Sequence, residues 1–130
     1  MNRFRFLIAA WLLASCGGGA KPPAIPEELP GGWKRASLST PPPESAPELA
    51  RSLGVKLVTE AVFSGPGKIT VTYYTMGASA SAFELVQKWK PEPGEVFLSE
   101  GPHFVVARGP MLDGKPVKEI AKAIETELRR

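Results

Sequence analysis

Residues 55–76, VKLVTEAVFSGPGKITVTYYTM, decide the fold of this chain. Apolar and polar positions alternate up to Phe63, and Ile, Val, Thr and Tyr are dense after Lys68. Such alternation is typical of a strand with one buried face, and β-branched and aromatic residues favour strands. The Ser-Gly-Pro-Gly run at 64–67 joins the two halves and is typical of a turn. We therefore predict a β-hairpin with strands at 55–63 and 68–76.

The sequence on either side of this hairpin predicts further short elements. Downstream, a helix begins at Ser79 or Ser81, because apolar residues recur at helical spacing. This apolar stripe, in which Trp89 is expected to be a core residue and not a ligand-binding one, consists of Ala82, Leu85, Val86 and Trp89. The other predicted elements are strands at 33–38, 96–98 and 103–108, a short helix that is capped by Ser45 and runs to about Leu53 before Gly54, and a last helix beginning at Asp113 or Gly114.

From Val55 onward the predicted order is strand, strand, helix, strand, strand, helix. The two halves are similar in length, so an internal duplication is one hypothesis, although no residue identity between the halves supports it. Neither hairpin can bury its apolar side alone, and a sheet with helices packed against it can. The expected fold class is α+β, an antiparallel sheet with a ββαββα core and helices on one face.

The first 16 residues have the features of a targeting signal. Arg3 and Arg5 precede an apolar run at 6–13, and Leu13-Ala14-Ser15 leads into Cys16, the only cysteine. This is the plan of a secretory signal peptide, and the apolar run is far shorter than the ~20 residues of a spanning helix. The Leu-Ala-Ser-Cys ending resembles the lipobox of bacterial lipoproteins. The resemblance implies cleavage before Cys16 and lipidation of its thiol; a conventional signal followed by an unrelated cysteine is the alternative.

These features predict three segments along the chain. They are a lipoprotein signal peptide at 1–15, a lipidated Cys16 with a Gly/Pro-rich tether at 16–32, and a single α+β domain at 33–130. The implied location is the bacterial cell envelope, facing the periplasm or the exterior. Gly17 follows the cysteine where an Asp tends to retain lipoproteins of diderm bacteria in the inner membrane, so the outer membrane is favoured.

Charge argues against a nucleic-acid partner. Of 16 Lys and Arg residues, Arg3 and Arg5 lie in the signal, which leaves 14 against 13 acidic residues. The remaining basic residues are scattered, whereas a nucleic-acid-binding protein concentrates them on one face. The expected partners are therefore the membrane, through the lipid on Cys16, and an envelope protein or a cell-wall component.

The sequence holds no motif typical of an active site. His103 is the only histidine and Asp113 the only aspartate, and a Gly-x-Ser-x-Gly nucleophile turn is absent from the sequence. We expect His103 to be exposed at the start of its strand. No ligand spacing for a metal is visible, so we expect no catalytic residue, metal or cofactor. The convergence of paired acids for glycoside hydrolysis stays an alternative, from Glu60, Glu92, Glu95 and Glu100.

Tyr73 and Tyr74 are adjacent in a strand, so they point to opposite faces of the sheet. One is expected in the core and the other on an open face beside Thr70 and Thr72. These four residues predict a partner-binding surface, with an ordinary solvated face as the alternative. The function predicted from the sequence is a lipid-anchored extracytoplasmic binding or accessory domain. The alternative is a small cell-envelope hydrolase, and a ligand-binding sensor lies between the two.

The part after the signal also resembles uncharacterised bacterial lipoprotein domains. The resemblance covers most of the domain and has diffuse motifs. That family carries no assigned activity, so the resemblance implies no site residues. The matching features are Gly32-Trp33, the short helix at 49–54, the hairpin at 56–75, the helix at 79–89 and the Phe-Val-Val run at 104–106.

Overall fold

The hairpin at 55–76 forms the centre of the sheet, as predicted. In the computed structural model, which describes residues 21–109 and 114–130, β4 (Val55–Ser64) pairs antiparallel with β5 (Lys68–Met76). Val62 lies opposite Thr70, and Thr59 lies opposite Tyr73. The predicted signal peptide, Cys16 and Asp113 lie outside the described residues.

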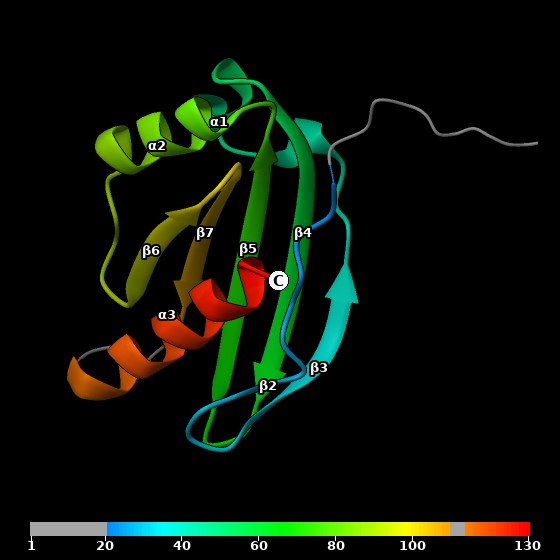
Figure 1. The fold of residues 1–130 in the computed structure, drawn as a ribbon. Helices are drawn as coiled ribbons and strands as arrows, with labels where there is room; N and C mark the ends of the chain where they lie inside the picture. Colours follow the sequence, from blue (N-terminus) through cyan, green and yellow to red (C-terminus); the bar gives the residue numbers. More distant parts are fainter. Residues whose placement is uncertain (1–20, 110–113) are drawn as a thin grey trace, which may run out of the picture.

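Four more strands extend this hairpin into a curved antiparallel sheet (Figure 1). The strand order is β2-β3-β4-β5-β7-β6, so the second hairpin joins the first through β7. Tyr73 of β5 lies opposite Val105 of β7, and Glu95 of β6 lies opposite Arg108 of β7. The added strands are β2 (Glu28–Leu29), β3 (Trp33–Ser39), β6 (Glu95–Glu100) and β7 (His103–Arg108).

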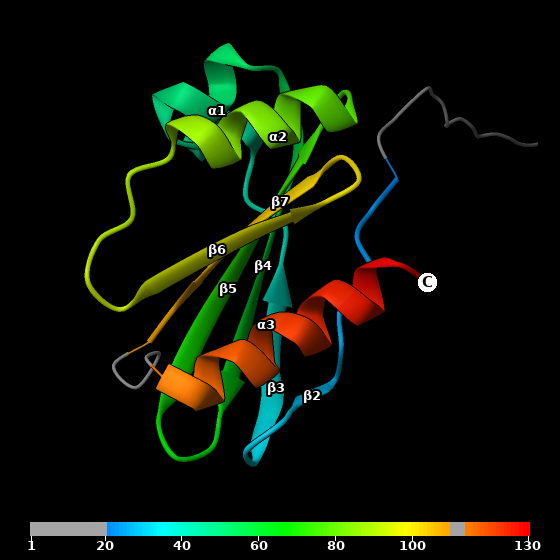
Figure 2. The ribbon, with the colours of Figure 1, turned by 60° about the vertical axis from the view of Figure 1, so that its left-hand side comes forward.

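The helical elements are short, except for the last. They are the 3-10 helix η2 (Pro43–Ser45), α1 (Glu48–Ser52), α2 (Ser79–Lys88) and α3 (Gly114–Leu128). Gly54 follows α1 with a φ of 91°, the left-handed conformation predicted for the residue that ends this helix. In Figure 2, α1 and α2 lie together at one end of the sheet, and α3 lies across the other part.

The core consists of two clusters on opposite sides of the sheet. On one side, Tyr73 and Val105 pack with Ile120 and Ile124 of α3. On the other side, Tyr74 and Phe104 pack with Leu85 of α2, together with residues of α1. Because neighbouring residues of a strand face opposite sides, Tyr73 and Tyr74 belong to different clusters.

The α+β class and the antiparallel sheet are confirmed, and the helices are divided between the two faces rather than packed on one. The reason lies in β5 and β7, where residues 71–76 and 103–107 are buried without interruption. A strand that is covered on both faces is buried on both, so its residues do not alternate between buried and exposed. The placement of α2 and α3 on opposite faces also removes the symmetry that the duplication hypothesis would need.

The domain begins before residue 33, so the predicted boundary between tether and domain is wrong. Pro23 and Pro26 are buried, Ile25 packs against the core, and Leu29 is a core residue in β2. Arg35 of β3 donates hydrogen bonds from Nη1 to the carbonyl oxygens of Ile25 and Pro26. The prolines indicated an extended chain, and such a chain can also lie on a sheet and bury its apolar side chains.

Candidate functional site

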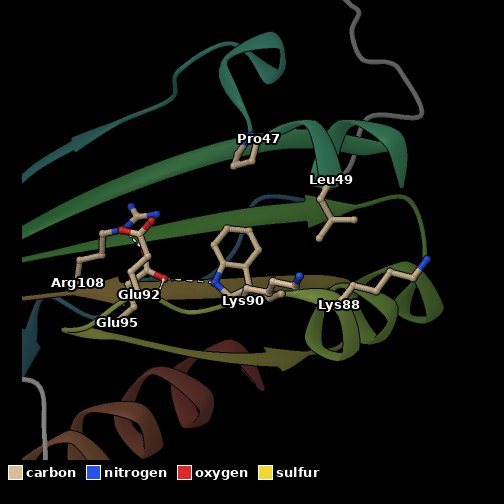
Figure 3. A pocket seen from close by; sticks show the side chains of 8 residues that line it. Pro47, Leu49, Lys88, Lys90, Glu92, Glu95 and Arg108 are labelled. Atoms are coloured by element: carbon tan, nitrogen blue, oxygen red, sulfur yellow. Dashed lines mark hydrogen bonds and ion pairs between the residues drawn. The ribbon is translucent and has the colours of Figure 1, made fainter.

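A pocket of about 430 Å³ opens where α1, the end of α2 and the β6–β7 hairpin meet (Figure 3). Its volume lies in the range of roughly 300–1,000 Å³ that small-molecule sites occupy. The pocket is on the same face of the sheet as Tyr74 and the helices α1 and α2. The residues that line it are Pro47, Leu49, Lys88, Trp89, Lys90, Glu92, Glu95 and Arg108.

Trp89 reaches the pocket because α2 ends just before it. Its backbone is extended, with φ −69° and ψ 136°, and its N–H donates to the carbonyl of Leu85. Pro91 and Pro93 follow, and a proline cannot continue a helix. The indole is half-buried and packs on Phe104 and Tyr74, with ring centroids 5.1 and 6.3 Å apart. The prediction that Trp89 is a core residue is therefore right for its inner contacts and wrong for its outer side, which lines the pocket.

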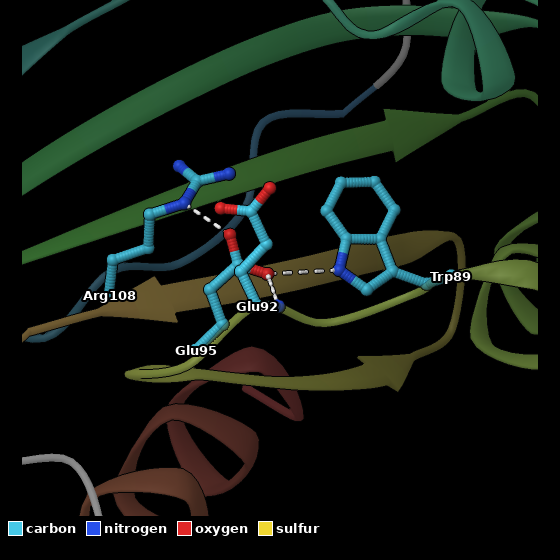
Figure 4. Close-up of polar contacts among 4 residues, drawn as sticks. All are labelled: Trp89, Glu92, Glu95 and Arg108. Carbon is cyan, nitrogen blue, oxygen red and sulfur yellow. Dashed lines mark hydrogen bonds and ion pairs between the residues drawn. The ribbon is translucent and has the colours of Figure 1, made fainter.

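Glu95 is held by three hydrogen bonds that fix the floor of the pocket (Figure 4). Its Oε1 accepts from Trp89 Nε1 at 3.3 Å and from the Glu92 backbone N–H at 3.2 Å. Its Oε2 accepts from Arg108 Nε at 2.5 Å. Because Glu95 and Arg108 lie directly opposite in the β6–β7 register, their side chains share one face of the sheet.

The surroundings of Glu95 favour its ionised form. Burial works to raise the pKa of this carboxyl, and only 7% of its side chain is exposed. Hydrogen bonds from Arg108, from the Glu92 backbone and from Trp89 outweigh burial and hold the pKa below its usual range. Glu95 is therefore a carboxylate at neutral pH, suited to accepting hydrogen bonds rather than to donating a proton.

Tyr74 lies beside this network, in the wall that supports Trp89. Burial raises the pKa of its phenol, and the nearby Arg108 guanidinium opposes that rise. The phenol therefore stays protonated at neutral pH. Tyr74 is only 4% exposed, and its role is to support the aromatic side of the pocket rather than to form an outer surface.

Charged side chains of both signs border the pocket. Lys88 pairs with Glu84 one helical turn away, at 2.7 Å. Lys90 and Glu92 are exposed, and within residues 21–109 and 114–130 neither side chain forms an ion pair. The pocket therefore combines one aromatic plane with hydrogen-bond donors and acceptors that carry full charges.

The predicted partner surface of Tyr73, Tyr74, Thr70 and Thr72 does not form. Tyr73 is fully buried under α3, and Tyr74 and Thr72 are 4% and 5% exposed. Only Thr70 is half-buried. The prediction was wrong because it assumed one open face, whereas helices cover both faces of β5.

The expectation of an exposed His103 is also wrong. His103 is buried, and its Nδ1 lies 2.9 Å from the hydroxyl of Thr75 on the neighbouring strand. Burial lowers the pKa of the imidazole. Asp113, which a Ser-His-Asp arrangement would need, lies outside the described residues.

Two of the four carboxylates considered for paired-acid chemistry come together. Glu92 and Glu95 both line the pocket, whereas Glu100 pairs with Arg129 at 3.2 Å and Glu60 is not among the lining residues. In the described part of the chain, no group of three or more His, Cys, Asp or Glu residues could hold a metal ion.

Sequence reasoning missed Arg108 altogether and missed Trp89 as a pocket residue. The pair of prolines after Trp89 could have indicated its place in the pocket. These prolines end the helix before Trp89, so the indole need not follow the apolar face of the helix. What brings Arg108 to the pocket is its position at the end of a buried strand, opposite Glu95, the first residue of β6. That pairing depends on the strand register, which the sequence did not specify.

Comparisons with known proteins give no relative. No family model matches the sequence, and no match was found among curated proteins or among solved structures. The resemblance to uncharacterised lipoprotein domains thus stays a prediction. Among the described helices, none is both long enough and apolar enough to cross a membrane.

Proposed function

We propose that this chain is a lipid-anchored binding or accessory domain of the bacterial cell envelope, which holds its ligand in the pocket beside Trp89. The observation that carries the binding role is the fixed network of Trp89, Glu95 and Arg108. It positions an aromatic plane and charged groups before any ligand arrives, which lowers the cost of ordering them on binding. The Leu-Ala-Ser-Cys context of Cys16 supports the anchor.

The alternative of a small envelope hydrolase is favoured by one observation, the shared location of Glu92 and Glu95. Hydrolysis by paired acids needs one carboxyl that stays protonated until it donates to the leaving group. The lowered pKa of Glu95 leaves it only the other role, that of the ionised base or nucleophile. Both of its oxygens already accept hydrogen bonds, from Trp89, the Glu92 backbone and Arg108, which argues against that role too. Binding without chemical change therefore fits the pocket better.

The anchor is tested by mass spectrometry of the mature N-terminus. We expect acylated Cys16 and loss of residues 1–15. Several acyl chains would anchor the protein far more firmly than one, at ~0.8 kcal/mol per buried methylene. A Cys16→Ser variant should be unprocessed or mislocalised. An unmodified Cys16 in a soluble mature chain would refute the anchor.

The pocket is tested by retention of the detergent-solubilised full chain on insoluble envelope material from the producing cells. Lys90→Glu reverses an exposed charge at the pocket rim and should lower retention at least fivefold. The matched control is Lys118→Glu, an exposed lysine of α3 on the other face of the sheet, which should retain like the wild type. Equal retention of all three proteins would refute the pocket as the binding site.

A further inference from the structure

The indole of Trp89 is held rigidly at the pocket. Phe104 and Tyr74 pack against it from inside, and its N–H is fixed on Glu95. An aromatic ring that cannot swing away offers an apolar plane at no further entropic cost on binding. A flat ligand surface of C–H groups matches such a plane.

Hydrogen-bond donors and acceptors lie beyond the N–H edge of the indole. In Figure 4 the Glu92 carboxylate lies between Trp89 and Arg108, and the two terminal nitrogens of Arg108 point away from Glu95. Lys90, labelled in Figure 3, adds a third charged group to the lining of the pocket. A ligand on Trp89 therefore meets acceptors and donors together.

This mixture discriminates between classes of ligand. Lys88 and Arg108 are already paired with carboxylates, Glu84 and Glu95. An anion attracted by Lys90 would be repelled by Glu92, and a cation attracted by Glu92 would be repelled by Lys90. A purely apolar ligand would remove water from these charged groups without replacing their hydrogen bonds, which is costly. A hydroxyl group both donates and accepts, so it can satisfy carboxylate and cationic neighbours alike.

We infer that the ligand of the pocket is a neutral saccharide, with the C–H face of one sugar ring stacked on Trp89 and its hydroxyls bonded to Glu92, Arg108 and Lys90. This inference rests on the proposed binding function and names its ligand class. Charge-assisted hydrogen bonds to the hydroxyls orient the sugar, and the stacking supplies the apolar contact.

The test is isothermal titration calorimetry of the full chain in detergent at pH 7. The neutral probes are tetra-N-acetylchitotetraose and cellotetraose. The charged probes are the glucosamine tetramer, which lacks the acetyl groups of the first probe, and tetragalacturonate. We expect at least one neutral probe to bind, and each charged probe to bind at least tenfold more weakly. Failure of both neutral probes, or tighter binding of a charged probe, would overturn the inference.

Two variants, with Phe83→Ala as their control, test whether the sugar binds on Trp89. Trp89→Ala should weaken binding at least tenfold, and Phe83→Ala, which removes a 58% exposed aromatic outside the pocket, should leave it unchanged. Because Trp89→Ala also removes core contacts, Glu92→Gln serves as the variant that keeps the fold, and it should weaken binding threefold or more. Equal effects of Phe83→Ala and Trp89→Ala, or no effect of Glu92→Gln, would overturn the inference.

Competition separates this inference from the proposed function. If the bound neutral probe releases the chain from envelope material, both stand. If retention depends on Lys90 but neither neutral probe competes, the pocket remains the binding site and the saccharide is wrong. If retention does not depend on Lys90, the proposed function fails, whatever the calorimetry shows.

Discussion

Replacing Glu95 with Gln tests the network that fixes the pocket. The substitution keeps the shape of the side chain and removes the charge that accepts from Arg108 Nε, Trp89 Nε1 and the Glu92 N–H. Breaking a fully buried ion pair costs about 3–5 kcal/mol, and breaking an exposed one costs about 0–1 kcal/mol. Glu95 is 7% exposed but Arg108 is 44% exposed, so solvent screens the pair. We expect Glu95→Gln to lower the free energy of unfolding by about 1–2 kcal/mol at pH 7.

The pH dependence of this loss has a definite sign. The pKa of Glu95 is lowered in the folded chain, so its contribution is fully present above the unfolded pKa of about 4.3. It disappears as the pH falls through the lower, folded pKa, because the wild-type carboxyl then becomes neutral as well. The difference between wild type and Glu95→Gln should therefore shrink steadily below about pH 4.

Urea unfolding, monitored by far-UV circular dichroism at pH 7 and at several values down to pH 3, measures the loss of unfolding free energy and its dependence on pH. Glu84→Gln is the matched control, because Glu84 forms an exposed pair with Lys88 on a helix and should contribute only about 0.3–0.5 kcal/mol. A loss in Glu95→Gln no larger than in Glu84→Gln would refute the network as a stabilising unit. A loss that stays constant down to pH 3 would refute the assignment to the carboxylate charge.

Three further changes test the core by the same unfolding assay. Phe104→Ala removes a fully buried ring that contacts Tyr74, Trp89 and Phe97, and should lower the free energy of unfolding by about 3–5 kcal/mol; a loss under 1 kcal/mol would contradict the aromatic cluster. Tyr73→Phe removes a buried hydroxyl that has no hydrogen-bond partner in the described part of the chain, and should leave stability unchanged or raise it by up to about 1 kcal/mol, whereas a clear loss would reveal a partner. Burial lowers the pKa of His103, so the wild type should lose stability as the pH falls below about 6.5, and His103→Gln should lack this component of the pH profile; identical profiles would contradict it.

The sequence predicts the local elements of this fold well, because its periodicities are strong. The 55–76 hairpin, the helix from Ser79 and the last helix all form within a few residues of their predicted bounds. Each depends on patterns within one segment, such as alternation up to Phe63 or a Gly-Pro turn. Information of this kind is local and can be read without knowing what the segment packs against.

What could not be predicted depends on partners that are distant in sequence. The burial of Tyr74 needs α1 and α2 on the face that was expected to be open. The pairing of Glu95 with Arg108 needs the register of β6 against β7, since a shift of one residue would turn the two side chains to opposite faces. The pocket therefore becomes visible only after the sheet is assembled, although every residue that lines it was present in the sequence.

The start of the packed domain near Pro23 limits how far the domain can lie from a lipid on Cys16. If Cys16 carries the lipid and the packed chain begins at Pro23, six residues link them. A fully extended chain spans at most ~3.3–3.6 Å per residue, so this link reaches only about 20 Å. The tether expected up to residue 32 would have reached much farther. With the lipid on Cys16, so short a link would hold the domain close to the bilayer and would raise the effective concentration of any ligand at that surface. If the ligand is the saccharide inferred above, weak binding of single sugar rings would be sufficient, because such an anchor would keep the pocket close to the envelope surface.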